Sequence, residues 1–221
     1  MVALMVVAVF VGFGPTYYYA GVFRAPLPAP IIHVHGALFS CWMLLLVTQT
    51  LLVSTHRVDV HRKLGRAGMF VASAMVVVGV LAATNALMRT PTVAGRNAQA
   101  FYIVPITDMV IFGTMMAFAY RERKDSAAHK RFILMATIAL MIAAFARWPV
   151  AAIHRNVFGA TLVVEAFWLM LVLYDLWSLH RVHSATLWGG VFMIAIQQIR
   201  LPISNTEAWH HVAAWVQATF R

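Results

Sequence analysis

The sequence has little charge, few acidic residues and almost no cysteine. Only 11% of its 221 residues are charged and only seven are acidic, whereas 62% are hydrophobic and the mean hydropathy is +0.79. A typical soluble domain carries roughly twice this share of charged residues. These shortages exclude a water-soluble globular fold, and we predict an integral membrane protein.

Other absences narrow the class further. The single cysteine, Cys41, has no partner in the chain for a disulfide, and we interpret it as a small buried side chain. The sequence shows no glycine-rich phosphate loop, no repeat of 20 to 50 residues and no low-complexity linker, so we predict one domain covering residues 1–221. Residues 187–201, the last apolar stretch long enough to span a membrane, contain no lysine, which excludes a retinal Schiff base there.

Positive charge is present in excess, with 17 Lys and Arg residues and a formal net charge of +10. In a soluble protein this excess would suggest nucleic acid as a partner. Here most of the basic residues lie between apolar stretches, where they determine membrane orientation and attract anionic lipid. We therefore expect the lipid bilayer as a partner and no nucleic acid.

The apolar stretches predict an all-α fold, an integral membrane bundle of seven transmembrane helices. A final stretch, residues 206–220, has apolar residues at helical spacing but is too polar and short to span, so we predict an interfacial amphipathic helix. The predicted spans are residues 1–22, 31–54, 67–88, 101–120, 132–146, 158–177 and 187–201.

Loop charge predicts the orientation. The loops after the second, fourth and sixth spans are short and together carry ten Lys and Arg residues, against seven on the opposite side. Because short cytoplasmic loops are enriched in basic residues, we place these loops in the cytoplasm. The amino terminus is then cytoplasmic and the carboxyl terminus periplasmic.

A stripe of larger, partly polar residues runs along the second span. His35, Trp42, Gln49 and His56 recur every seven residues, which keeps them near one face of a helix. The step from the first to the last covers roughly 31 Å, about the thickness of the hydrocarbon core. We interpret the stretch as a dry support whose two ends belong to separate sites, of which the end at His35 is the better supported.

Polar residues of the other spans sort into two layers at these depths. Asp108 and Glu165 of the outer layer are the strongest functional signal, because carboxylates inside spans are costly. With His35 or His33 they form a candidate transition-metal site, although two histidines two residues apart diverge by about 200° on a helix. Proton relay and simple ion pairing of the carboxylates with Arg147, Arg200 or His35 are the alternatives. The remaining candidates for substrate contact or charge pairing in this layer are Arg147, His154, Asn85, Gln197 and Arg200.

The inner layer offers a second candidate site. Three loop histidines, His61, His129 and His183, with Asp175 near the end of its span, match a site of three histidines and one carboxylate. Haem b is the other candidate cofactor, held by His61 with His129 or His183 inside, or by His35 with His154 outside. The chain lacks the fourteen-residue histidine spacing of a stacked di-haem bundle.

Several segments carry a resemblance to known sequences. HVHGALFSCW, HRKLGRAG, HKRFILMATIALMIAAFAR and YDLWSLHRVHSATLWGG resemble recurring blocks of a family of uncharacterised bacterial multi-pass inner-membrane proteins of the domain-of-unknown-function type. The resemblance implies a bacterial inner-membrane location and a seven-helix bundle, but no activity. At position 165 this chain has Glu where the family more often has Asp. By matching blocks, the positions of interest are His35, His61, Asp108, His129, Arg147, Asp175 and His183.

From these patterns we expect a membrane-embedded redox or metal-binding protein, with haem or a transition metal held by histidines and carboxylates. It would serve electron transport or act as a subunit or accessory of a membrane oxidoreductase, with another membrane protein or a second copy of the chain as partner. The alternatives are an intramembrane zinc-dependent lipid hydrolase with Asp108 or Asp175 as general base, a proton-coupled carrier and a purely structural subunit. Whether the protein is an enzyme stays open at this point.

Overall fold

The computed structural model describes residues 1–24, 28–93 and 95–220. Within them the regular elements are helices apart from one short hairpin, which confirms the all-α class. The elements in chain order are α1 (Val2–Phe13), the π-helix η1 (Gly14–Tyr18), α2 (Pro30–Ser54), α3 (Val58–Arg89), β1 (Thr92–Val93), β2 (Arg96–Asn97), α4 (Ala98–Arg121), α5 (Ser126–Leu140), α6 (Ile142–Phe145), α7 (Val157–Leu179), α8 (Ser184–Ile203) and α9 (Glu207–Thr219).

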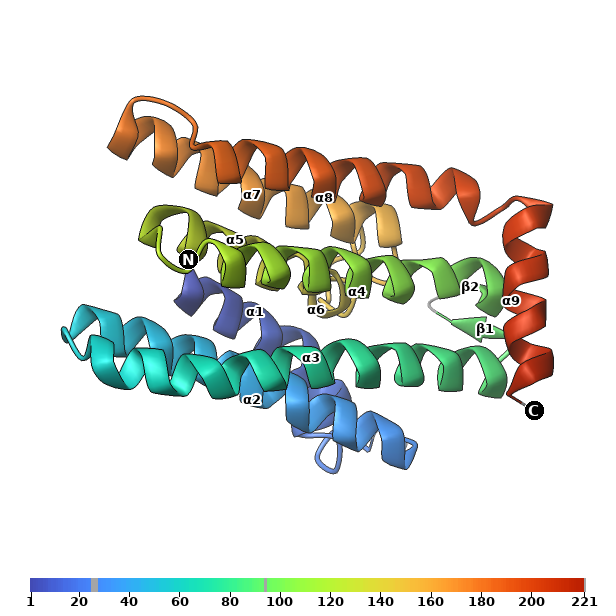
Figure 1. The fold of residues 1–221 in the computed structure, drawn as a ribbon. Coiled ribbons are helices and arrows are strands. Elements are labelled where there is room, and N and C mark those ends of the chain that lie inside the picture. Colours follow the sequence, from blue (N-terminus) through green and yellow to red (C-terminus); the bar gives the residue numbers. More distant parts are fainter. Residues whose placement is uncertain (25–27, 94, 221) are drawn as a thin grey trace.

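The long helices lie roughly side by side, and α9 crosses their ends (Figure 1). Along the bundle α2 packs on α3, α3 on α4, α4 on α5, and α8 on α4, α5 and α7, while α1 packs against α6. The connections 55–57, 122–125 and 180–183 share one end of the bundle, here named the loop end. The opposite end, here named the α9 end, is crossed by α9 and carries the carboxyl terminus (Figure 1).

Five helical segments are long and apolar enough to cross a membrane. They are α2, α3, α4, α7 and Ser126–Phe145, which joins α5 and α6. Their outward side chains are large and apolar, as in Phe70 and Trp177, which are both 79% exposed and suit contact with lipid. A multi-pass membrane bundle is therefore confirmed, whereas the number of seven spans stays a prediction, because α1 with η1 is shorter and α8 carries Gln197 and Arg200.

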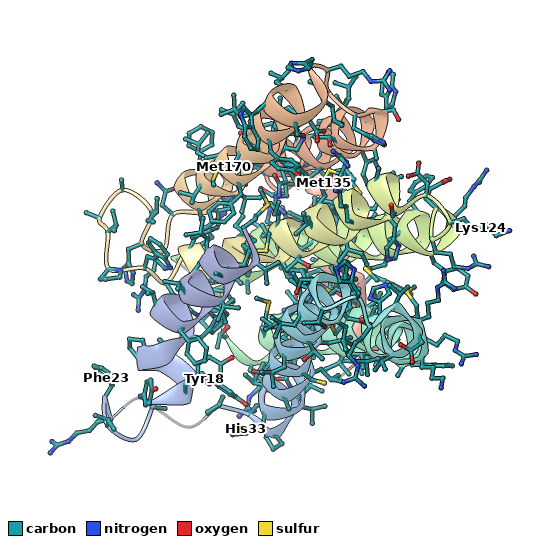
Figure 2. All side chains as sticks on the ribbon, turned by 90° about the vertical axis from the view of Figure 1, so that its left-hand side faces the viewer. Tyr18, Phe23, His33, Lys124, Met135 and Met170 are labelled. Carbon is teal, nitrogen blue, oxygen red and sulfur yellow. The ribbon has the colours of Figure 1, made fainter. Side chains whose placement is uncertain are left out.

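The core of the bundle is built from methionine, alanine and branched or aromatic side chains. A view along the helices shows Met135 of α5 near the middle of the molecule and Lys124 at its periphery (Figure 2). Phe112, Met135 and Ile138 are completely buried. The core therefore lies between α4, α5 and the helices packed on them, and the loop residue Lys124 lies outside it.

Two segments differ from the predicted spans. Helix α3 begins at Val58, nine residues before the predicted Ala67, so His61 lies on a helix and not in a loop. Because its 32 residues extend for about 48 Å, its charged first turns reach beyond a hydrocarbon core of about 30 Å. The predicted fifth span is interrupted at Met141, where the chain passes from α5 to α6.

The amphipathic helix at the carboxyl end is confirmed as α9, close to its predicted bounds. Its buried side chains, Ala213 and Val216, pack against Leu87 of α3 and Tyr102 of α4. The indole N–H of Trp209 donates a hydrogen bond of 2.8 Å to the carbonyl of Gln99. These contacts fix α9 across the ends of α3 and α4, and its location at the membrane surface stays a prediction.

Candidate functional site

Two of the predicted inner-layer histidines lie beside each other at the loop end. His61 is the fourth residue of α3 and His129 the fourth residue of α5, and their ring centroids are 6.4 Å apart with nearly perpendicular planes. Sequence position alone did not select this pair, because His183 was an equal candidate. The packing of α3 and α5 around α4 selects it.

The two rings have different hydrogen-bond environments. Nδ1 of His129 lies 2.7 Å from the carbonyl oxygen of Ala119. Because a carbonyl only accepts, this contact puts the ring proton on Nδ1 and leaves the lone pair on Nε2. Nδ1 of His61 is buried and has no hydrogen-bond partner among the described residues. Nε2 of His129 therefore has a free lone pair in this tautomer, and Nδ1 of His61 makes no contact that assigns its proton.

Gln49 of α2 adds a third polar side chain to this end. Its amide nitrogen donates a 3.2 Å hydrogen bond to the backbone carbonyl of His61, which joins α2 to the start of α3. Its buried amide oxygen has no partner within the described chain. An amide oxygen is a metal-ligand type, and this one lies on the side chain that contacts the backbone of His61.

Asp175 does not join the histidine pair. It is completely buried and forms a bidentate ion pair with Arg131 of α5, with Nε donating to both carboxylate oxygens at 3.0 and 3.2 Å and Nη2 also bonded to Oδ1. The hydroxyl of Thr186 donates to Oδ2 at 2.6 Å, and the backbone N–H of His183 donates to it at 3.1 Å. The carboxylate thus joins α5, α7 and the start of α8.

His183 has a structural position as the amino-terminal cap of α8. Its Nδ1 accepts a 3.1 Å hydrogen bond from the N–H of Ala185, which satisfies one free donor of the helix. The expected set of His61, His129, His183 and Asp175 is therefore not assembled around one point. In the part of the chain that the structure describes, no three His, Cys, Asp or Glu residues form a group able to hold a metal.

At the other end of the bundle, Asp108 of α4 pairs with Arg200 of α8. Both side chains are buried, and Nη1 of Arg200 lies 2.6 Å from Oδ1 of Asp108. The guanidinium also reaches the hydroxyls of Thr107 and Thr161 at 3.3 and 3.4 Å. This arrangement agrees with the ion-pairing alternative for Asp108, in which the carboxylate fixes helix packing.

The other outer-layer candidates are separate from Asp108. Glu165 accepts a 2.6 Å hydrogen bond from Gln198 on an exposed part of the bundle. His35 stacks on Phe39 at 4.0 Å, and His33 lies beside Tyr17 at 5.8 Å between ring centroids. The structure therefore does not bring the proposed ligands His33, His35, Asp108 and Glu165 together.

Of the remaining candidates, Gln197 is completely buried in α8, and the other three have local roles or none that the structure explains. Arg147 donates to the carbonyl of Ala143 at 2.6 Å and covers the ring of Phe13 at 4.6 Å. Nδ1 of His154 lies 3.1 Å from the carbonyl of Trp148 on an exposed loop. Asn85 is half-buried in α3, and nothing in the structure assigns it a role.

Sequence reasoning missed Arg131 and Gln49 as members of these clusters. Arg131 lies in a basic segment where its charge suggested only membrane orientation, yet its side chain is 2% exposed. Arg131 could have been predicted as the partner because it lies at the same depth in the membrane as Asp175, and a carboxylate inside a membrane needs a cation beside it. Gln49 was noted as part of the α2 stripe, but its contact with α3 depends on how α2 and α3 pack.

Comparisons with known proteins add no relative: no family model matches the chain, and neither a curated protein nor a solved structure matches it. The resemblance to a bacterial inner-membrane family stays a prediction.

Proposed function

We propose that this multi-pass membrane protein binds a transition-metal ion at the loop end through His61 and His129, and that it acts as a membrane-embedded redox or metal-binding component. The observation that carries the proposal is the approach of these two imidazoles from different helices. Histidine is the commonest protein ligand for transition metals. We further propose that the loop end faces the cytoplasm of a bacterial inner membrane, in line with its basic loops.

The separation of the rings allows a shared metal. An ion bound at about 2.0–2.1 Å from each imidazole nitrogen lies about 3.2 Å from each ring centroid. The observed separation of 6.4 Å therefore corresponds to nitrogens on nearly opposite sides of the ion, and tetrahedral coordination would require the centroids to approach to about 5.2 Å. The hydrogen bond from His129 to the carbonyl of Ala119 is of the kind that orients metal-bound histidines. The amide oxygen of Gln49 and water would complete the coordination.

Haem b is the alternative form of this proposal, because its iron takes two axial histidines at a similar separation. Haem needs a planar slot between α3 and α5, whereas a bare ion needs only a small adjustment of the two rings. An absorption spectrum of the purified protein, together with metal analysis, distinguishes the two. A Soret band indicates haem, and about one metal per chain without this band indicates an ion.

Variants test the assignment of the ligands. We expect His61→Ala and His129→Ala each to lower the affinity for Co²⁺, used as a spectroscopic probe, by at least about tenfold. His154→Ala is the matched control, because that imidazole is exposed and lies in a loop far along the chain from both ligands. No stoichiometric metal and no Soret band in the purified protein would rule the proposal out.

A purely structural membrane subunit is the second candidate. It is favoured by the two buried aspartates, each of which is neutralised by a buried arginine. The same pairing counts against a lipid hydrolase, since Asp108 and Asp175 were its candidate general bases. Wild-type protein that contains no metal and copurifies with one membrane partner in a fixed ratio would favour the structural role.

A further inference from the structure

Buried polar atoms gather on one face of α8 toward the α9 end. Gln197 is completely buried, and neither its amide oxygen nor its amide nitrogen has a hydrogen-bond partner among residues 1–24, 28–93 and 95–220. Nε of Arg200, one turn further along α8, is also buried and has no hydrogen-bond partner within those ranges. Donors and an acceptor thus lie together in an otherwise apolar bundle.

Such atoms are costly to bury unless something bonds to them. The groups include both donors and an acceptor, and water can bond to both kinds. Asp108 does not fill this need, because its contact with Arg200 is through Nη1 and not through Nε. The composition of the cluster therefore points to water as the missing partner.

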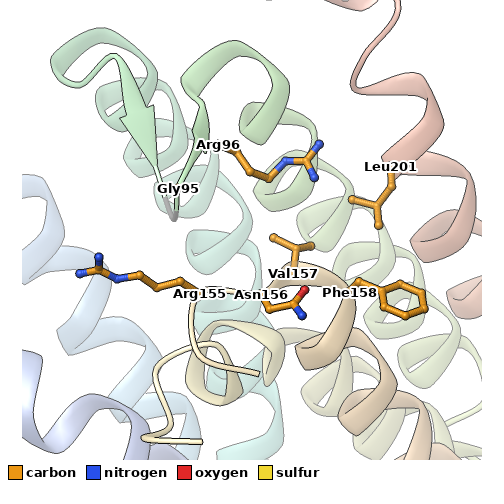
Figure 3. Close-up of a pocket in the computed structure, with 7 residues that line it drawn as sticks. All are labelled: Gly95, Arg96, Arg155, Asn156, Val157, Phe158 and Leu201. Atoms are coloured by element: carbon orange, nitrogen blue, oxygen red, sulfur yellow. The ribbon is translucent and has the colours of Figure 1, made fainter. Parts of the chain in front are cut away.

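An open pocket lies next to this cluster at the α9 end. It has a volume of about 320 Å³, and its lining includes Arg96, Asn156, Val157 and Leu201 (Figure 3). Nε of Arg96 is another buried polar atom that finds no partner in the described chain. The pocket thus adds a further donor beside the cluster.

Direct contacts connect the pocket to the buried ion pair. Nη2 of Arg96 donates a 3.0 Å hydrogen bond to Ser204, which caps the end of α8 one turn beyond Arg200. From the α7 side, Thr161 donates to the carbonyl of Val157 at 2.9 Å and lies 3.4 Å from Nη2 of Arg200. Polar groups therefore continue from the pocket wall to Arg200 along both helices.

We propose that the pocket is the mouth of a water-filled vestibule that reaches Arg200, Asp108 and Gln197 from the α9 end. Bound water supplies the hydrogen-bond partners of the Gln197 amide and of the Nε atoms of Arg96 and Arg200. The vestibule gives water, and small solutes that hydrogen-bond as water does, access to the buried ion pair from one side only. This hydrated site is independent of the metal proposed at the loop end.

Hydroxyl-radical footprinting by X-ray radiolysis tests the vestibule, because radicals form from water already inside the protein. Met193 lies one turn before Gln197 on α8 and is 0% exposed, and Met75 of α3 is its equally buried control. We expect Met193 to be oxidised at least about fivefold faster than Met75 in the full-length wild-type protein. Equal rates would overturn the proposal.

A variant provides a second, opposite readout. If water bonds to the amide of Gln197, then Gln197→Leu removes a partner of that water, lowers the melting temperature and slows the oxidation of Met193 to the rate of Met75. If the site is dry, the same change removes a costly buried amide and raises the melting temperature. An unchanged or raised melting temperature would therefore also contradict the vestibule.

Discussion

Arg131 and Arg200 are the two largest completely buried side chains in the described part of the chain, and each pairs with one aspartate. Within an apolar bundle, a buried ion pair gains little over two apolar residues, but a buried charge without its partner is very unfavourable. The two ion pairs therefore restrict helix packing to one register. In this register Asp108 of α4 contacts Arg200 of α8, and Arg131 of α5 contacts Asp175 of α7.

Replacing one member of an ion pair tests whether the stability of the bundle depends on that pair. We expect Arg200→Met to destabilise the protein by about 3–5 kcal/mol, because it leaves Asp108 buried without a cation. The double variant Asp108→Leu, Arg200→Met should recover most of that loss. Thermal unfolding in detergent measures both, and equal losses in the single and double variants would contradict the account.

Glu122→Gln is the control for this experiment. Glu122 pairs with Arg121 at 3.7 Å; the side chain of Arg121 is 78% exposed and that of Glu122 is 41% exposed. Exposed ion pairs contribute at most about 1 kcal/mol. A change in melting temperature near zero is therefore expected for this variant.

The sequence predicted the partner of one buried aspartate but not that of the other. Asp108 and Arg200 were both recognised as polar residues at one depth, and ion pairing between them was one of the alternatives. The partner of Asp175 was not predicted, because Arg131 belongs to a run of basic residues whose members look alike in sequence. Only the rotation of α5 about its axis distinguishes Arg131, which is buried, from its exposed neighbour Lys130.

At the scale of single elements, α2 shows how far a periodic pattern can be followed. The stripe was predicted to have its better-supported site at the His35 end. In the structure Trp42 is buried, with its indole N–H donating to Thr137 at 3.2 Å, and Gln49 contacts the start of α3. The opposite end is the one that meets other histidines, because α3 begins earlier than predicted and carries His61 toward α5.

The start of α5 carries a cap with a pH dependence. Oδ1 of Asp125 accepts hydrogen bonds from the N–H groups of Ala128 and Ala127, at 3.1 and 2.9 Å, and these lower the pKa of the carboxyl. A lowered folded-state pKa means that the stabilisation is complete above the ordinary carboxylate pKa. It is lost as the pH falls through the lower folded-state pKa.

We therefore expect Asp125→Ala to lower the melting temperature at neutral pH, with Asp125→Asn retaining most of the cap. The difference between wild type and Asp125→Asn should be constant from about pH 7 to pH 5 and shrink below about pH 4. Thermal unfolding across this range checks it. A difference that grows on acidification would show that the carboxylate does not act as the cap.

Helix α9 offers a matched pair of tryptophans. Trp209 packs on Tyr102 with ring centroids 6.0 Å apart and hydrogen-bonds Gln99, whereas Trp215 is 66% exposed. We expect Trp209→Ala to cost about 2 kcal/mol and to make the segment after Ser204 sensitive to protease. Trp215→Ala should change stability by less than about 0.5 kcal/mol. Equal protease sensitivity in the two variants would contradict the docking of α9.

For the whole molecule, composition was sufficient to predict an all-α membrane bundle, and helical spacing was sufficient to predict α9. The end of the bundle to which each connection belongs also followed, since the connections after α2, α4 and α7 share the loop end. The break at Met141 and the crossing of α9 could not be predicted, because both depend on side-chain packing between distant helices.

The orientation of the bundle can be checked by fusions to the carboxyl terminus. With the loop end in the cytoplasm, a carboxyl-terminal alkaline phosphatase should be active, because it folds in the periplasm, and a green fluorescent protein fusion should be dark. Activity in the opposite fusion would reverse the assignment. The basic residues of the loop end are the physical reason for the expected result.

The central claim is that His61 and His129 bind one metal between them. X-ray absorption spectroscopy of the metal-loaded protein tests it most directly, because imidazole rings scatter with a recognisable pattern. The account predicts two imidazole ligands at about 2.0–2.1 Å in the wild type. It predicts one in His129→Ala and an unchanged pattern in His154→Ala. A wild-type spectrum without imidazole ligands, or one that His129→Ala leaves unchanged, would contradict it.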